Sequence, residues 1–198
     1  MSHYYKFDPN LESDIKEIFY DYRGEKLKFL TDAGVFSKDR VDFGTNVLLN
    51  AITDEDLINK KIIDVGCGYG VIGLCVAKRY PTSVVDLVDV NLRALELTNI
   101  NKESNKIENA RIYESNAYSS VVDKYDLIIT NPPIRAGKDV VWNIVIGGYE
   151  FLNSGGAIYV VIQKKQGAPS LIKEMNSIYK EVLIVEKKNG YNIIKGVK

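Results

Sequence analysis

The chain has 198 residues, of which 45% are hydrophobic and 26% charged, so its composition is that of one globular domain and excludes a disordered protein. Its formal net charge is zero, and overall charge therefore gives no support to nucleic-acid binding. The charge is uneven, however: residues 151–198 carry eight lysines against three glutamates, an excess that either faces phosphates or forms a solvated surface.

Residues 1–52 precede the regular part of the sequence. Residues 11–22 (LESDIKEIFYDY) predict a helix ended by Gly24, and residues 26–37 predict two short strands around Ala33 and Gly34. Thr45 is placed to cap a short helix over residues 45–52. Two interpretations stay open for this segment: a packing appendage, or a cover over a site at the edge of a sheet.

From Lys61 onward, short β-branched runs alternate with helical patterns. Strands are predicted over 61–66, 83–90, 110–115, 126–131, 157–163, 181–188 and 191–198, and helices over 71–80, 92–104, 138–152 and 168–180. This alternation predicts that residues 53–198 form a doubly wound α/β domain, with a seven-stranded, mostly parallel, Rossmann-like sheet covered on both faces. Asn189-Gly190 is a strong hairpin signal, so we expect the last strand to run antiparallel to its neighbour.

A glycine-rich turn follows the first strand of this domain. The strand ends in Asp64, and glycines at 66, 68, 70 and 73 open a helix, which allows a sharp turn and close approach of a ligand to the backbone. A dinucleotide-binding fold is the competing interpretation. Asp64 and the glycine spacing argue against it, because a carboxylate there would repel a pyrophosphate but not the cationic S-adenosylmethionine.

Two polar residues follow the next strands. Asp89 ends its strand about twenty residues after the glycine turn, where an acid can accept hydrogen bonds from both ribose hydroxyls of an adenosine. The alternative is a plain helix cap. Asn116 follows the third strand, where its side-chain carbonyl would accept from the adenine amino group.

The sequence Asn131-Pro132-Pro133-Ile134 directly follows the strand residues 126–130. Asn-Pro alone is a common loop signal. At the carboxyl end of a central strand it gains meaning, because the prolines stiffen the turn and leave the Asn131 side-chain oxygen and a backbone carbonyl free to accept from a planar amino group. Two fixed acceptors would aim the lone pair of that amine at a methyl group.

The order of these motifs resembles class I S-adenosylmethionine-dependent methyltransferases that modify exocyclic or amide nitrogens. Blocks at 34–39, 41–45, 131–138 and 161–168 look like the "methyltransferase small" family, in its short single-domain form, whose relatives include small-subunit ribosomal RNA guanine-N2 methyltransferases. The resemblance implies a catalytic role for Asn131, Pro132 and Pro133. It implies cofactor contacts at Asp64, Gly66, Cys67, Gly68, Gly70, Asp89, Val90, Asn116, Ala117 and Asn131.

The chain departs from the family pattern at Ile134. Many relatives have an aromatic residue there that stacks on the target base, so stacking here is expected from Phe36 or the Arg135 guanidinium. The further expected substrate contacts are Ile134 itself, Lys138, Lys164 and Lys165.

The expected function is methyl transfer to an exocyclic amine of RNA, with guanine N2 in small-subunit ribosomal RNA as the target. The alternatives are a protein glutamine-amide methyltransferase, a nicotinamide-dependent oxidoreductase and a catalytically silent binding module. The expected partner is RNA or an assembling ribosomal subunit, bound by a cytoplasmic monomer or homodimer. Neither a membrane nor a metal is expected, because no apolar run nears the roughly 18 residues of a membrane span, and Cys67, Cys75 and His3 match no zinc or disulfide framework.

Overall fold

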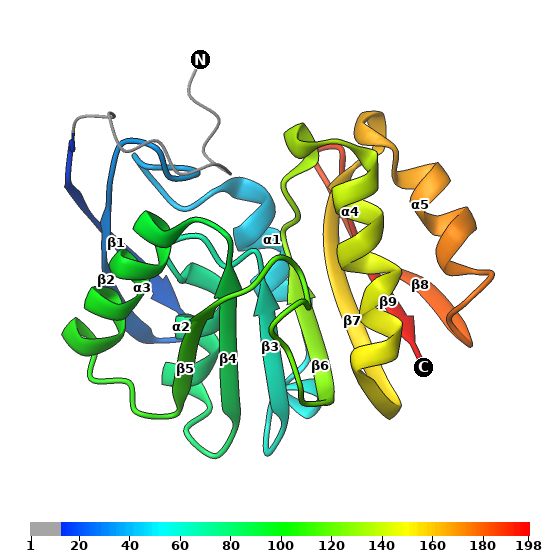
Figure 1. The fold of residues 1–198 in the computed structure, drawn as a ribbon, viewed down its shortest axis with the longest axis horizontal. Helices are drawn as coiled ribbons and strands as arrows, with labels where there is room; N and C mark the ends of the chain where they lie inside the picture. The colour runs from blue at the N-terminus through cyan, green and yellow to red at the C-terminus, as the bar shows by residue number, and fades with distance from the viewer. Residues whose placement is uncertain (1–12) are drawn as a thin grey trace.

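A seven-stranded sheet of order β5-β4-β3-β6-β7-β9-β8 dominates the computed structural model, which describes residues 13–198 (Figure 1). Strands β3 to β7 are parallel, and β9 runs antiparallel to both β7 and β8, as the hairpin signal predicts. The fold class predicted from the sequence is therefore confirmed. The strands are β3 Lys61–Val65, β4 Val84–Asp89, β5 Ala110–Glu114, β6 Tyr125–Thr130, β7 Leu152–Gln163, β8 Glu181–Lys188 and β9 Tyr191–Val197.

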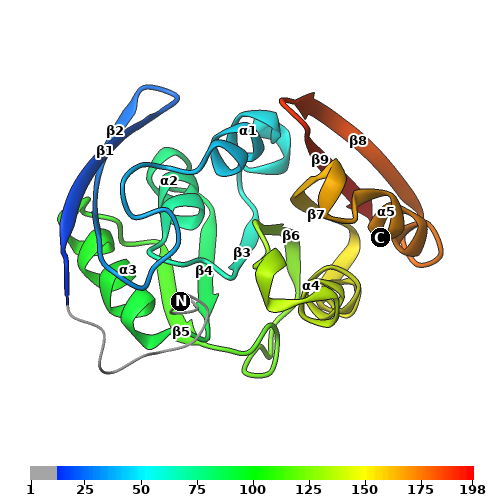
Figure 2. The same ribbon diagram turned by 90° about the horizontal axis from the view of Figure 1, so that it is seen from above.

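Helices cover both faces of the sheet and define two hydrophobic cores (Figure 2). Alternation along the strands divides the apolar side chains, so that Ile62 packs into the core of α1, α2 and α3, and Ile63 into the core of α4 and α5. The α-helices are α1 Phe43–Ala51, α2 Val71–Arg79, α3 Leu92–Ser104, α4 Lys138–Val145 and α5 Ala168–Met175. The 3₁₀ helices are η1 Asp54–Asp56, η2 Ile134–Ala136, η3 Gly147–Phe151 and η4 Lys164–Gln166.

The helix predicted over 138–152 is shorter in the structure. Helix α4 ends at Val145, and η3 begins at Gly147. Gly148 has no room for a side chain, since a Cβ there would lie 2.6 Å from the Tyr118 hydroxyl oxygen. Within residues 13–198, none of the helices combines the length and apolar character needed to cross a membrane.

The segment before the sheet is a β-hairpin, and the prediction of a helix there was wrong. Strands β1 Lys16–Tyr22 and β2 Glu25–Thr31 pair antiparallel along their full length. Arg23 and Gly24 form the turn, both with positive φ, as a tight two-residue hairpin requires. Helix-forming Glu and Lys residues misled the prediction, whereas the alternation of Ile18, Tyr20 and Tyr22 with exposed residues is a strand pattern. Residues 11 and 12 lie outside the described part.

The hairpin is fastened to helix α3 by two asparagines. The Asn101 amide donates to the Leu30 carbonyl and accepts from its N–H, at 3.0 and 2.7 Å. Asn105 makes the same pair of bonds to Lys28, at 2.7 and 3.0 Å. These amides satisfy the outer edge of β2 as a further strand would. After β2 the chain forms a loop over 32–42, and the second strand predicted around Ala33 and Gly34 does not form.

Helix α1 begins two residues earlier than predicted, because its cap is Asp42 and not Thr45. The Asp42 carboxylate accepts a hydrogen bond from the Thr45 backbone N–H at 3.1 Å. A carboxylate at this position satisfies one of the unpaired N–H groups of the first turn. The Thr45 hydroxyl is thereby left for a contact elsewhere.

Candidate active site

A cavity of about 940 Å³ lies at the carboxyl edge of the parallel strands, where chain segments far apart in sequence meet. This volume is near the upper end of small-molecule sites, and such edges of α/β sheets are where ligands bind. One part of its wall, here called the cofactor half, comes from residues 66–69, 71, 72, 89–91, 94 and 115–117. The other part, the substrate half, comes from residues 42, 45, 131–136, 163, 166 and 191. Residues 35–37 and 41, from the loop over 32–42, also line the cavity.

The glycine turn shapes the cofactor half with backbone alone. Gly66 and Gly68 have φ of +74° and +57°, a left-handed conformation that side-chain-bearing residues rarely adopt. The Gly66 and Cys67 N–H groups donate to the Val88 carbonyl at 2.9 and 3.0 Å, which ties the turn to β4. A Cβ on Gly68 would touch nothing within 4 Å, so the space beside the turn is open to a ligand.

Two predicted cofactor residues do not line the cavity. Asp64 is fully buried; one carboxylate oxygen accepts from the Gly73 N–H at 2.8 Å, and the other has no partner among the described residues. Burial raises the pKa of Asp64 to about 7. Gly70 has φ of +92° and lies against Thr98 and Leu74, at the start of α2. Both residues hold the turn against its helix, and direct cofactor contact by either stays a prediction.

Asp89 and Asn116 lie in the cavity wall. The two carboxylate oxygens of Asp89 accept from the Gly68 and Asn91 N–H groups at 2.8 and 2.9 Å, and each keeps capacity for a further donor. Burial raises the pKa of Asp89. Asn116 is exposed on its side chain, and its backbone carbonyl accepts from the Ser119 N–H at 3.1 Å. The remaining predicted cofactor residues Gly66, Cys67, Gly68, Val90, Ala117 and Asn131 also line the cavity.

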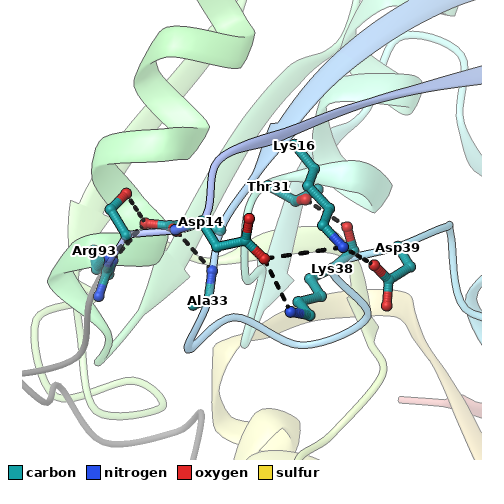
Figure 3. Close-up of polar contacts among 9 residues, drawn as sticks. Asp14, Lys16, Thr31, Ala33, Lys38, Asp39 and Arg93 are labelled. Carbon is teal, nitrogen blue, oxygen red and sulfur yellow. Dashed lines mark hydrogen bonds and ion pairs between the residues drawn. The ribbon is translucent and has the colours of Figure 1, made fainter.

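Charged side chains contact the loop over 32–42, part of which lines the cavity (Figure 3). Arg93 donates to the Asp32 carboxylate at 2.7 Å, while Lys38 pairs with Asp14 at 3.2 Å and Lys16 with Asp39 at 2.5 Å. Burial alone would raise the pKa of Asp32, but hydrogen bonds from neighbouring groups, including Arg93, hold it below its usual value. The loop is thus held in place, and its Phe36 lies in the cavity wall.

Asn131 is held in one orientation by two residues of helix α1. Its side-chain nitrogen donates to the Thr45 hydroxyl oxygen at 2.9 Å and to an Asp42 carboxylate oxygen at 3.4 Å. Because a carboxylate can only accept, the amide nitrogen must face Asp42. The amide oxygen accepts no hydrogen bond from a described residue, which leaves it as the group available to a ligand.

The prolines bring the Asn131 loop against the glycine turn. Pro132 is buried and Pro133 half-buried, and both line the cavity. A Cβ on Gly66 would lie 4.0 Å from Pro133 Cδ, so the two motifs lie close together in the cavity wall. The structure therefore brings together the two strongest sequence signals, which are far apart in the sequence.

The predicted substrate residues fall into two groups. Phe36, Ile134 and Arg135 line the cavity. Lys138, Lys164 and Lys165 are exposed and outside its wall, with Lys138 Nζ 4.7 Å from the centre of the Trp142 ring.

Among residues 13–198 no three potential ligands of the His, Cys, Asp and Glu types gather as a metal site would require. Cys67 and Cys75 are buried free thiols, and burial raises the pKa of each well above its usual value.

Five polar residues of the substrate half were given no site role by the sequence prediction. Asp42 and Thr45 belong to the block at 41–45, and Gln163 and Gln166 to the block at 161–168, so the family resemblance contained them without assigning a function. Tyr191 directly follows the Asn189-Gly190 turn, and nothing in its local sequence indicates that it reaches the cavity.

Comparison with known proteins gives the family. The family model of the methyltransferase small domain matches residues 26–195. The uncharacterized protein YbxB of Bacillus subtilis (strain 168) is 44% identical over 198 residues, covering 99% of this chain and 98% of that protein. Ribosomal RNA small subunit methyltransferase C of Haemophilus influenzae (strain PittGG) is 30% identical over 187 residues, covering 91% of this chain and 56% of that protein.

A solved structure shares the fold. The 16S rRNA N2 guanine methyltransferase RsmC of T. thermophilus, in complex with AdoMet and guanosine, superposes with a TM-score of 0.85 at 22% identity, covering 96% of this chain and 52% of that one. The chain thus spans about half the length of the ribosomal RNA methyltransferases that it matches. A nicotinamide-dependent oxidoreductase is excluded by the family match. This chain belongs to the methyltransferase small family of S-adenosylmethionine-dependent methyltransferases.

Proposed function

We propose that this protein methylates an exocyclic amine of RNA, and that its target is guanine N2 in small-subunit ribosomal RNA. The names of relatives that share the family support the RNA class of substrate. The observation that carries the proposal is the orientation of Asn131, whose amide nitrogen is bound to Thr45 and Asp42 so that its oxygen can accept from an amine.

The residues of the cofactor half fit S-adenosylmethionine. The open space beside Gly68 accommodates a ligand against the backbone, and Asp89 next to it offers oxygens to two ribose hydroxyls. Asn116 would accept from the adenine amino group. When bound, S-adenosylmethionine would supply a methyl group on a cationic sulfur: the amine nitrogen would bond to this carbon in line as the carbon–sulfur bond breaks, S-adenosylhomocysteine would leave, and the methylated amine would lose one proton to water.

Asn131 prepares the amine for that displacement. An exocyclic amine is a poor nucleophile because its lone pair is delocalised into the ring. An acceptor fixed against it favours a pyramidal nitrogen and points the lone pair at the methyl group. Pro133 lies near Gly66 in the cavity wall, so the amine held by Asn131 would be placed beside the cofactor half.

Cations near the cavity support a polyanionic substrate. Arg135 lines the cavity, and Lys164 and Lys165 follow directly after the end of β7, where Gln163 lines it. The Lys164 N–H donates to the Gly190 carbonyl at 2.9 Å, which places η4 beside the tip of the β8–β9 hairpin, where Lys187 and Lys188 add two more exposed charges. Such clusters contact phosphates without reading sequence.

The test is to find the methylated atom. Purified protein is incubated with labelled S-adenosylmethionine and either naked small-subunit RNA or subunits from cells that lack the protein, and the label is mapped by mass spectrometry. We expect one methylated guanine, modified at N2. A label on a protein glutamine would replace this proposal with the glutamine-amide alternative, and a label on another base would retain the RNA class and change the target.

A further inference from the structure

The side chains of Gln163 and Tyr191, which have no role in the proposed methyl transfer, face the cavity from neighbouring strands. Gln163, the last residue of β7, pairs with Tyr191, the first residue of β9, and directly paired residues point to the same face of a sheet. Both line the cavity. The face is that of helix α1, because the Tyr191 and Phe43 rings lie 5.6 Å apart between centroids. None of the roles derived above uses either residue.

Tyr191 lies next to the group that orients Asn131. A Cβ on Gly44 would be 2.7 Å from the Tyr191 ring and 2.9 Å from the Asp42 carboxylate, so these two side chains flank the same point. Asp42 in turn accepts from Asn131. An aromatic ring is therefore present beside the amine-binding asparagine, although Ile134 replaces the aromatic residue expected after the two prolines.

The strand register gives the separation between Gln163 and Asn131. Thr130 of β6 pairs with Val160 of β7, so continuing the register places Asn131 beside Val161. Gln163 lies two residues further along β7 on the same face. Two residues of strand and one strand spacing correspond to about 8 Å between the backbones. A purine whose base-pairing edge is bound at one end by Asn131 and at the other end by Gln163 fits between these two side chains.

The Gln163 amide has no hydrogen-bond partner among the described residues, although the residue is half-buried. A half-buried amide without a protein partner can bond to water, and one that faces a cavity can exchange that water for a ligand. An amide offers one acceptor oxygen and a nitrogen that donates. The matching partner is an edge that presents a donor and an acceptor side by side.

Only one amine-bearing RNA base has such an edge next to its amine. Beyond N2, guanine presents the N1–H donor and then the O6 acceptor. Adenine presents only the N1 acceptor beyond its amine, and cytosine presents two acceptors, N3 and O2. Sequence-specific RNA readers use these Watson–Crick edges and stack the base on aromatic rings.

On the basis of the proposed methyl transfer, on which this step depends, we infer that Gln163 selects guanine by binding N1–H and O6 while Asn131 holds N2. The base packs against the Tyr191 ring. Gln163 is a specificity-determining residue and takes no part in the displacement itself. The protein should therefore distinguish guanine from purines that carry the same 2-amino group but a different edge.

The experiment uses RNAs that differ only at the target base, which is guanine, 2-aminopurine or 2,6-diaminopurine. 2-Aminopurine keeps the reacting amine and lacks both N1–H and O6, so we expect the parent protein to prefer guanine in kcat/KM by about 10- to 100-fold, the scale of losing two hydrogen bonds. In Gln163→Ala this preference should shrink to within about threefold.

Gln163→Glu gives a second readout. Its carboxylate still accepts from guanine N1–H but cannot donate to O6, so the preference for guanine over 2-aminopurine should be weaker than in the parent. A residue that only supports the fold would not move the ranking of bases. Asn192→Ala is the matched control, because Asn192 adjoins Tyr191 on the opposite face of β9 and does not line the cavity. This variant should rank the target bases by kcat/KM in the same order as the parent.

Binding of guanosine and 2-aminopurine riboside to the protein loaded with S-adenosylhomocysteine separates this inference from the proposed reaction. If Gln163→Ala keeps the parental preference for guanine, or the parent has none, Gln163 does not select the base, whatever the reaction. If no RNA is methylated but guanosine binds better than 2-aminopurine riboside only when Gln163 is intact, the inference holds and the proposed reaction is wrong. If the binding preference is also absent, both are wrong.

Discussion

The two halves of the cavity differ in how their polar groups are used. In the cofactor half the groups that shape the glycine turn are bound to the protein: Asp89 accepts from two backbone N–H groups, and the Gly68 carbonyl accepts from the Thr98 hydroxyl at 2.8 Å. In the substrate half the Asn131 oxygen and the Gln163 amide have no partner among the described residues. The first half thus depends mainly on the fixed backbone of the turn, and the second mainly on side chains that face a ligand. Substitutions should therefore change affinity and stability in the first half, and turnover and selection in the second.

Asn131→Ala should give the largest effect. The single-turnover rate of methyl transfer should fall by about 10²- to 10³-fold, the scale for removing one preorganised polar contact, because the side-chain acceptor for the amine is lost. Affinity for S-adenosylmethionine, measured by calorimetry, should stay near the parental value, since the side chain belongs to the substrate half. Asn99→Ala, on the exposed side of α3, is the control. A parental rate in Asn131→Ala would mean that the loop does not grip the amine.

Asp89→Ala tests the cofactor half. Affinity for S-adenosylmethionine and S-adenosylhomocysteine should fall by about 10- to 100-fold, because charge-assisted bonds to the ribose are lost. Thermal stability should fall too, since the Gly68 and Asn91 N–H groups lose their acceptor. Asp139→Ala, an exposed acid on α4, should change neither quantity. Lower stability with unchanged cofactor affinity would restrict Asp89 to holding the turn.

Thr45→Val tests the orientation of Asn131 while leaving the Asp42 cap in place. Val has the shape of Thr but cannot accept from the Asn131 amide, so kcat should fall by about 3- to 10-fold with little change in KM for RNA, as expected for one neutral hydrogen bond. Thr45→Ser keeps the hydroxyl and should restore most of the rate. Equal rates in the Val and Ser variants would show that this bond does not position the asparagine.

Neutralising Lys164 and Lys165 to Gln should give the smallest effect, outside both halves. RNA affinity should weaken by a few fold at moderate salt, and the slope of log K against log salt should decrease in magnitude by about one to two, while cofactor affinity stays constant. Lys60 and Lys124, at the opposite edge of the sheet, provide the matched double variant. An unaltered slope would assign Lys164 and Lys165 to the solvated surface.

Local sequence predicted the cofactor half better than the substrate half for a physical reason. The glycine turn, β4 and Asp89 lie within one contiguous β-α-β segment, where strand, turn and helix signals follow one another. The substrate half depends on contacts between α1, β6, β7 and β9, which periodicity does not reveal. Asp42 illustrates this: it was overlooked as a cap because Thr45 is also a good capping residue, and its contact with Asn131 spans 89 positions. The β1 hairpin was missed because residue types typical of helices occupied a strand pattern.

The position of β9 also has a consequence for folding. This strand follows β8 in the chain but lies between β7 and β8 in the sheet, so β8 pairs only with β9 and joins the sheet only when the hairpin inserts beside β7. Contacts between distant segments form late because the loop-closure entropy is lost first. Before insertion, β7 would present an unpaired edge at which chains can associate. Insertion of β9 both covers the edge of β7 and brings Tyr191 to the cavity. A molecule whose substrate half is complete therefore no longer exposes the strand edge at which chains would aggregate.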